Sequence, residues 1–294
     1  MKICRFDDDR LGIVIGEMVH DVTKAQDEIR AGARYDMKGD AVIAALPQWR
    51  KRLEDMAAKT PGKPLAGVKL LSPVARPCKT MAAPVNYVKH VAEMAARTDI
   101  RTEEQKQVKR PSKIGEQGIF LKANSAVVGA SEGIPIRFPD RINEHELEFV
   151  IIIGRQGSDI PKEKALDFVA GYALGFDMTT RGSEDRSFRK SIDGYAPVGP
   201  WLVTADEFGD PGDVTATLHV NDELRQTANT RELIFDVPRL IEFASSFYTL
   251  YPGDIYFTGS PAGVGPVKPG DVLRARCDRI GTLEIKARAH EIRA

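Results

Sequence analysis

The chain has 294 residues, with 42 Lys and Arg against 42 Asp and Glu, so its formal net charge at pH 7 is zero. This length allows one large domain, or a large domain with a small companion, and is enough for a complete core. Zero net charge argues against a nucleic-acid-binding protein and against a polybasic membrane-surface protein, because both need a basic excess. The composition therefore favours a small or acidic ligand.

The cysteines and the N-terminal residues indicate in which cellular compartment the protein is expected. Cys4, Cys78 and Cys277 lie far apart and form no Cys-x-x-Cys pair, which indicates neither a disulfide framework nor a structural zinc site. The first ten residues, MKICRFDDDR, lack the apolar core of a signal peptide, and no window approaches the roughly 18 apolar residues of a membrane span. We therefore predict a cytoplasmic protein with no nucleic-acid or membrane partner.

The first part of the chain has its own organisation. Residues 1–22 alternate apolar and polar side chains around turn residues, which predicts a small antiparallel meander. Residues 40–58 have helical spacing, which we expect to break at Pro47. A run rich in Pro and Gly follows, so we predict a small N-terminal α+β domain over 1–71 and a larger domain over 72–294.

Short strands separated by Gly and Pro dominate the rest of the chain. The predicted strands are 146–154, 172–177, 214–220, 254–259, 271–277 and 282–290. Helical spacing is clear only at 161–171 and 237–247. This pattern favours a mainly β sandwich or barrel with a few helices over a doubly wound sheet. The charged run at 97–118 is predicted to be a surface loop, either an ordinary one or an active-site lid.

One familiar catalytic motif in the sequence lacks the structural context that it needs. Residues 129–133, GASEG, match the Gly-x-Ser-x-Gly pattern of a nucleophile elbow, which needs a helix directly after the serine. Pro135 and Pro139 exclude that helix. The sequence therefore argues against a serine hydrolase.

The segment 146–154, ELEFVIIIG, places two acids at the start of an apolar strand. Alternate residues of a strand share a face, so Glu146 and Glu148 point together. Both faces are apolar after Glu148, which puts the two acids at the mouth of a core. A hard divalent metal would neutralise like charges placed in this way. The alternative is an exposed acidic strand end.

A third acid supports the metal interpretation. Asp177 ends the next apolar strand, after one intervening helix, and can reach the same sheet edge. Three carboxylates fit Mg²⁺ or Mn²⁺ better than Zn²⁺, which prefers His or Cys. Asp177 can also be an ordinary turn or cap residue.

His90 and Glu93 form a second candidate constellation. They lie three apart on a short predicted helix, where such side chains are neighbours. The carboxylate can orient the imidazole to remove a proton from water, although such pairs are also common on helix surfaces.

The loop that follows Asp177 is rich in charge. Arg181 is placed to bind a substrate carboxylate, and Lys190 to stabilise a developing oxyanion. We expect the remaining charged side chains of this loop to be solvated: Glu184, Asp185, Arg186 and Arg189.

Four ordered motifs make the chain resemble the fumarylacetoacetate hydrolase (FAH) superfamily from about residue 72 to 290. They are the Glu-x-Glu strand that ends at Gly154, the Gly-Tyr-x4-Asp segment at 171–177, the KSIDGYAPVGP stretch at 190–200, and the Pro-Gly-Asp and Thr-Gly-Ser-Pro signature within 250–265. The resemblance is to the acylpyruvase and 2-hydroxyhepta-2,4-diene-1,7-dioate isomerase branch. The chain departs from the family at Glu184, where many members have Gln.

The resemblance implies an FAH-like mixed β-sandwich roll, a homodimer, and a catalytic site built from the residues above. Mg²⁺ or Mn²⁺ would be held by Glu146, Glu148 and Asp177. The remaining roles would be water activation by His90 and Glu93, and substrate contacts from Lys190, Arg181 and Thr258.

Our leading hypothesis is a metal-dependent hydrolase that cleaves a carbon–carbon bond in a β-diketo acid of the acylpyruvate or fumarylpyruvate type, in aromatic-compound or amino-acid catabolism. The first alternative is an isomerase or decarboxylase of a 2-hydroxymuconate-type diacid on the same metal site, because FAH-type folds support several reactions. The second is an inactive, metal-stabilised binding protein.

Overall fold

The computed structural model describes residues 1–33, 38–97 and 114–291. Its first strands confirm the predicted antiparallel meander, since each pairs with the next in chain order. They are β1 (Lys2–Phe6), β2 (Arg10–Ile15) and β3 (Met18–Asp21). Two short strands extend this unit: β4 (Gly62–Pro64) pairs with β3, and β5 (Leu70–Leu71) pairs with β1.

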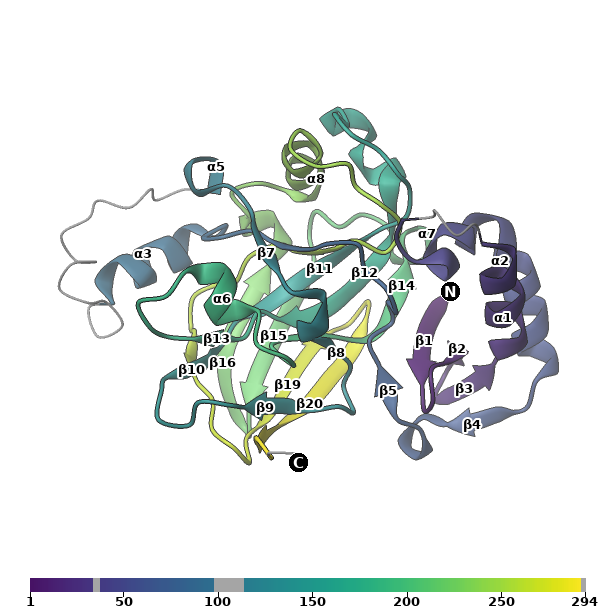
Figure 1. Ribbon diagram of the computed structural model, residues 1–294, viewed down its shortest axis with the longest axis horizontal. Coiled ribbons are helices and arrows are strands. Elements are labelled where there is room, and N and C mark those ends of the chain that lie inside the picture. The colour runs from purple at the N-terminus through teal and green to yellow at the C-terminus, as the bar shows by residue number, and fades with distance from the viewer. Residues whose placement is uncertain (34–37, 98–113, 292–294) are drawn as a thin grey trace.

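Two helices cover the meander at one end of the long axis of the molecule (Figure 1). They are α1 (Thr23–Gly32) and α2 (Ala41–Lys59). The expected break at Pro47 is wrong, because α2 continues through this residue. A proline inside a helix costs about 3 kcal/mol. Burial of Ile43, Leu46 and Leu53 on one face of α2, at about 1.5–3 kcal/mol for each side chain, outweighs that cost.

The largest sheet joins the meander to the rest of the chain. Among the described residues it has twelve strands, and its path runs from β4, β3, β2 and β1 into the strands listed next. These are β14 (Ala196–Thr204), β12 (Val169–Phe176), β11 (Leu147–Ile153), β17 (Ile255–Phe257), β6 (Thr80–Ala82) and β7 (Phe120–Lys122), with β8 (Val127–Val128) beside β14. Lys2 pairs with Val203, so the N-terminal strands are continuous with the central sheet, and the boundary at residue 72 stays a prediction.

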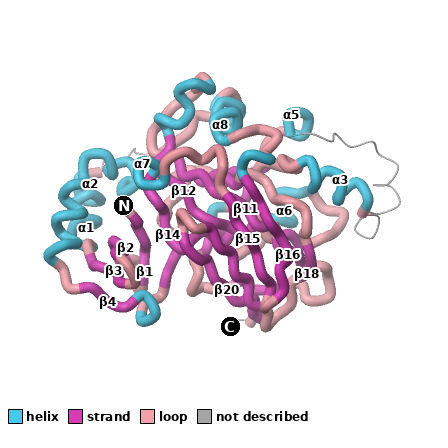
Figure 2. The backbone as a smooth tube through the Cα atoms, turned by 180° about the vertical axis from the view of Figure 1, so that it is seen from behind, coloured by secondary structure: helices cyan, strands magenta, loops and turns pink. Residues whose placement is uncertain are grey.

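A second, five-stranded sheet packs against the first (Figure 2). Its strands are β16 (Glu223–Asn229), β15 (Thr215–Val220), β19 (Val272–Cys277), β20 (Gly281–Ala289) and β9 (Ile134–Ile136). Leu218, Leu273 and Ile285 share one buried cluster with Phe149 and Tyr172 of the large sheet. This packing confirms the mainly β sandwich and the strands predicted for both sheets. A small third sheet holds β13 (Thr179–Thr180), β10 (Asn143–His145) and β18 (Gly265–Pro266).

The remaining helical segments are short. They are α3 (Val88–Ala96), α5 (Ile114–Gln117), α6 (Arg186–Lys190), α7 (Ala205–Phe208), α8 (Val237–Ser245), and the 3₁₀ turns η1 (Leu65–Gly67), η2 (Asn124–Ala126), η3 (Lys162–Phe168) and η4 (Thr230–Glu232). The helix α8 confirms the prediction for 237–247. The α-helix predicted over 161–171 is wrong, because 162–168 is a 3₁₀ turn and Val169 already pairs with Ile153 of β11.

Of the surface loop predicted over 97–118, residues 98–113 lie outside the described residues. Ile114–Gln117 forms α5, and Ile114 is buried, so this end of the run belongs to the core. Within the described parts of the chain, every helix is too short or too polar to cross a membrane.

Candidate active site

Three carboxylates meet where β11 begins and β12 ends. Leu147 pairs with Phe176, and the amide of Asp177 donates to the carbonyl of Glu146 at 2.9 Å, so the two chain segments are in register. Carboxylate oxygens of Glu146, Glu148 and Asp177 all lie within 4.8 Å of one another, and all three residues are buried. The structure thus brings together the three acids that the sequence places at strand ends.

Two buried lysines lie against this acid cluster. Lys190, at the end of α6, places Nζ 2.8 Å from Glu146 Oε2 and 2.7 Å from Asp177 Oδ2. Lys122 Nζ is 2.5 Å from the other oxygen, Asp177 Oδ1. Sequence reasoning missed Lys122; the available signal is a lysine that shares one face of a short apolar strand with the buried Phe120. The lysines compensate part of the negative charge of the cluster.

The acids differ in their electrostatic environment. Burial acts to raise the pKa of Glu146, but the charges of Lys190 and Arg181 outweigh it, so its pKa lies below the ordinary value. The pKa of Glu148 is raised well above its ordinary value, first by burial and then by the charges of Asp177 and Glu146. Glu148 accepts the Gly259 amide at 2.6 Å, and within the described chain no basic side chain forms an ion pair with it.

This donor set fits a divalent metal. Three buried carboxylates that converge within 4.8 Å offer hard oxygen ligands, and Glu148 is left without a compensating charge of its own. Mg²⁺ and Mn²⁺ prefer such ligands and accept further oxygens from water or substrate. A cation among these carboxylates would remove the repulsion that raises the pKa of Glu148.

The His90 and Glu93 pair is formed on α3. His90 Nδ1 lies 3.0 Å from Glu93 Oε2, and the second carboxylate oxygen, Oε1, accepts the amide of Gly263 at 2.9 Å. With Nδ1–H donating to the carboxylate, Nε2 is the basic nitrogen of the ring. Burial acts to raise the pKa of Glu93, but the hydrogen bonds from His90 and Gly263 outweigh it and hold this pKa below its ordinary value. The Gly259 amide of the same loop donates to Glu148, so this loop links the pair to the acid cluster.

Two glycines supply the amides that hold site carboxylates. Gly259 has φ +106° and Gly263 has φ +98°, in the left-handed region that favours glycine. A Cβ at Gly263 would lie 2.1 Å from the carbonyl oxygen of Arg225, and one at Gly259 would lie 2.7 Å from Asn86 Cβ. The loop that contains Gly259 and Gly263 is therefore tightly packed, and its backbone amides hold the carboxylates of Glu148 and Glu93.

The other predicted site residues have protein partners. Arg181 donates through Nε to Glu144 at 2.5 Å and through Nη2 to Glu146 at 3.3 Å. The Thr258 hydroxyl is buried and donates to the carbonyl of Phe149 at 2.8 Å. Sequence reasoning missed Glu144, which is 1% exposed, because its strand has only three residues and no periodicity to interpret.

The solvation expected for the loop after Arg181 is only partly found: Glu184 and Asp185 are exposed, as predicted, but Arg189 is not. Glu184 forms a two-bond pair with Arg141, at 3.0 and 2.6 Å, and this pair lowers the pKa of its exposed carboxylate. Asp185 caps α6 by accepting the amide of Ser187 at 2.7 Å. Arg189 is half-buried rather than solvated, and its guanidinium donates to the carbonyls of Glu184 and Thr180.

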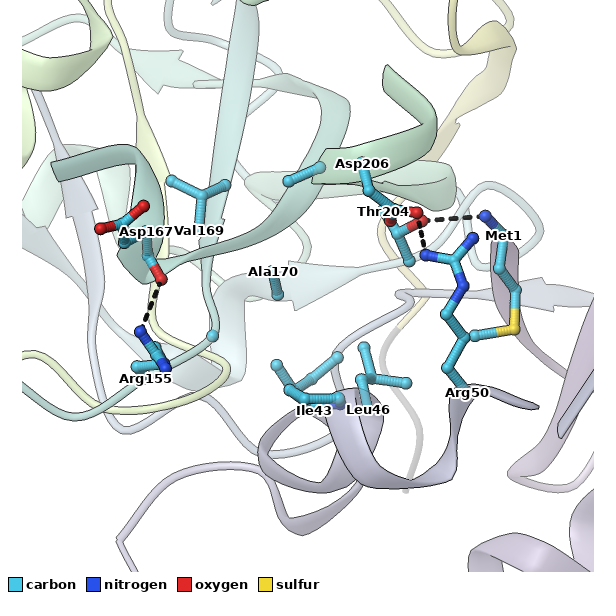
Figure 3. A pocket seen from close by; sticks show the side chains of 13 residues that line it. Met1, Ile43, Leu46, Arg50, Arg155, Asp167, Val169, Ala170, Thr204 and Asp206 are labelled. Carbon is cyan, nitrogen blue, oxygen red and sulfur yellow. Dashed lines mark hydrogen bonds and ion pairs between the residues drawn. The ribbon is translucent and has the colours of Figure 1, made fainter. Parts of the chain in front are cut away.

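A separate cavity of about 310 Å³ lies between α2 and the central sheet. In Figure 3, Ile43 and Leu46 of α2 face Val169 and Ala170, and Arg50 is paired with Asp206. None of the predicted site residues is among the described residues that line this cavity. The chemistry-bearing side chains therefore gather elsewhere, at the acid cluster.

The comparisons with known proteins agree with this site. Residues 79–287 match the fumarylacetoacetate (FAA) hydrolase C-terminal family. The chain is 48% identical, over 98% of its length and all of the relative, to a maleylpyruvate hydrolase of Aquipseudomonas alcaligenes. It is 38% identical to the crystal structure of maleylpyruvate hydrolase from Sphingobium sp. SYK-6 in complex with manganese(II) and pyruvate, with a TM-score of 0.82 over 99% of this chain and 100% of that one.

A less similar solved structure is that of an isomerase. The 5-carboxymethyl-2-hydroxymuconate delta-isomerase of Mycobacterium smegmatis is 28% identical, with a TM-score of 0.69 over 99% of this chain and 100% of that one. The family match spans most of the chain and contains the whole acid cluster. The chain therefore belongs to the fumarylacetoacetate hydrolase family.

Proposed function

We propose that the protein is a divalent-metal-dependent hydrolase that cleaves a carbon–carbon bond in an acylpyruvate, with maleylpyruvate as the first substrate to test. The observation that carries the proposal is a buried cluster of three carboxylates near an oriented histidine–glutamate pair. The full-length likeness to a maleylpyruvate hydrolase supports the substrate class.

Glu146, Glu148 and Asp177 would hold Mg²⁺ or Mn²⁺. When bound, the ion would supply Lewis acidity and a template for the 2-oxo acid end of the substrate. Manganese in the similar Sphingobium structure makes Mn²⁺ the first ion to test.

The chain's own residues would perform the proton transfers. His90, with Nδ1 held by Glu93, would take a proton from water through Nε2, and the water oxygen would add to the distal carbonyl carbon. Lys190 would stabilise the negative charge that develops on that oxygen. Rupture of the adjacent carbon–carbon bond leaves its electron pair on the pyruvate fragment, which takes up a proton, so the products are pyruvate and a carboxylic acid.

The charges of the loop after Arg181 are paired in a way that allows an acidic substrate. Arg141 pairs with Glu184, so the glutamate that departs from the family pattern does not present an unpaired charge. Arg181 and Thr258 are the proposed substrate contacts, and each also has the protein partner described above.

Isomerase or decarboxylase chemistry is the second candidate, because structures of such isomerases share the fold. That chemistry needs no attacking water, whereas the oriented His90 and Glu93 pair favours hydrolysis. An inactive binding protein would not need both the pair and the buried acids.

We further propose a cytoplasmic homodimer that acts in aromatic-compound or amino-acid catabolism.

The test uses purified, metal-free protein with acetylpyruvate and with maleylpyruvate, each without metal, with Mn²⁺ and with Mg²⁺. Loss of the enol absorbance and formation of pyruvate are followed together. We expect metal-dependent pyruvate release. A changed absorbance without pyruvate would instead favour isomerisation, and no change with bound metal would overturn both candidates for these substrates.

A further inference from the structure

The helix that carries the proposed base has little apolar anchorage. His90 is the one buried residue of α3, and Val88 at its start is 68% exposed. The helix lies at the end of the molecule opposite α1 and α2 (Figures 1 and 2). Since burial of apolar area is the main force that fixes surface helices, α3 needs other contacts to keep His90 beside the acid cluster.

Polar links at two successive turns supply those contacts. Glu93 accepts the Gly263 amide, as described above. One turn further on, at the C-cap, Arg97 donates through Nη2 to Glu144 Oε1 at 2.9 Å. The second oxygen of Glu144 accepts Arg181 Nε at 2.5 Å.

Glu144 is thus shared between two parts of the proposed active site. It belongs to β10, two residues before Glu146, and is 1% exposed. On one side it holds the arginine at the end of α3, and on the other it holds Arg181, which also contacts Glu146 at 3.3 Å. A buried carboxylate between two guanidinium groups forms short, directional, charge-assisted hydrogen bonds.

We propose that Glu144 is a positioning residue, whose ion pair with Arg97 holds the His90 and Glu93 pair of α3 at a fixed place beside the acid cluster. This inference rests on the proposed function for its effect on turnover. Displacement of a catalytic group by about 1 Å lowers the rate by about 100-fold. Loss of the pair therefore lowers kcat by about that factor and leaves KM and metal affinity nearly unchanged.

The test centres on Arg97→Gln, because Arg97 lies on the α3 side of the pair and its side chain is 23% exposed, so the variant replaces neither Arg181 nor a carboxylate of the acid cluster. Arg97→Lys is the conservative variant. Lys89→Gln is the matched control on the same helix, since Lys89 is 79% exposed and lies 3.9 Å from Glu232. The measurements are kcat and KM for pyruvate formation with Mn²⁺, the Mn²⁺ dissociation constant, and amide hydrogen exchange of residues 88–96.

We expect Arg97→Gln to speed exchange over 88–96 and to lower kcat about 100-fold. Arg97→Lys restores part of both effects, and Lys89→Gln changes neither. The double variant Glu144→Gln, Arg97→Gln speeds exchange over 88–96 no further than Arg97→Gln alone, because both substitutions act on α3 through the same Arg97–Glu144 pair.

Unchanged exchange over 88–96 in Arg97→Gln overturns the inference, and so does faster exchange with wild-type kcat. Exchange does not depend on the substrate. If the wild-type protein turns over no acylpyruvate but exchange still rises in Arg97→Gln, the proposed function fails while the anchoring of α3 by this pair stands.

Discussion

Replacement of Glu93 by Gln tests the histidine–glutamate pair most directly. The carboxylate accepts two hydrogen bonds, from His90 Nδ1 at 3.0 Å and from the Gly263 amide at 2.9 Å. A glutamine of the same shape has one accepting oxygen, so it cannot satisfy both donors, and its NH₂ group must face one of them. Either the loop bond is lost or the ring takes the tautomer with the proton on Nε2, which cannot accept a proton from water.

The size of the effect follows from these bonds. A hydrogen bond to a charged group contributes about 1.5–3 kcal/mol, which corresponds to about 10- to 150-fold in rate if it acts in the transition state. A wrong tautomer adds to this loss, as about 10⁴-fold for the corresponding change in serine proteases indicates. We therefore expect kcat of Glu93→Gln to fall between about 10- and 10⁴-fold.

The assay is pyruvate formation from an acylpyruvate at saturating Mn²⁺, with the Mn²⁺ dissociation constant measured in parallel. Glu242→Gln is the control, because Glu242 pairs with Arg239 on α8, a helix that carries none of the proposed site residues. A kcat for Glu93→Gln within about threefold of the wild type, with Mn²⁺ bound, would refute the role of this pair in water activation.

Three further changes test the acid cluster and its support. Glu148→Gln should weaken Mn²⁺ binding at least tenfold by calorimetry, since it removes a carboxylate without a compensating cation. Lys122→Met should lower the free energy of unfolding by about 3–5 kcal/mol in urea titrations, because it breaks a fully buried ion pair with Asp177. Gly259→Ala should lower both stability and Mn²⁺ affinity, since its Cβ would lie 2.7 Å from Asn86 Cβ and displace the amide that holds Glu148.

Each of these has an outcome that contradicts its reasoning. Undiminished Mn²⁺ affinity in Glu148→Gln would remove this residue from the proposed ligand set. A loss under 1 kcal/mol in Lys122→Met would mean that the lysine is not needed to balance Asp177. For Gly259→Ala, wild-type melting temperature and Mn²⁺ affinity would show that the loop relaxes without cost.

The sequence predicts those parts of the candidate site that depend on local patterns. The period of two in ELEFVIIIG placed Glu146 and Glu148 on one face, and the end of the next strand placed Asp177 close by. The i, i+3 spacing on α3 likewise placed His90 beside Glu93. Each of these arrangements depends on a repeat within a single element or on two strands that are adjacent in the sheet.

The missed features depend on contacts between distant segments. Lys122 and Asp177 lie 55 positions apart in the sequence, and β7 is not a neighbour of β12 in the sheet, so no local pattern encodes their contact. The Gly263 amide reaches Glu93 across 170 positions of sequence. Continuity of α2 through Pro47 is also a tertiary effect, since packing on the sheet outweighs a local penalty.

The pairing of β1 with β14 bears on how the protein can be shortened. A truncation near residue 72 would strip β1 from β14, because Lys2 and Ile3 pair with Val203 and Leu202. The edge of β14 at Leu202 and Val203, which β1 covers, would then be open to extension by other chains. Deletion of the first 71 residues is therefore expected to give an aggregating product, and engineering of the catalytic part alone would require a redesigned edge at β14.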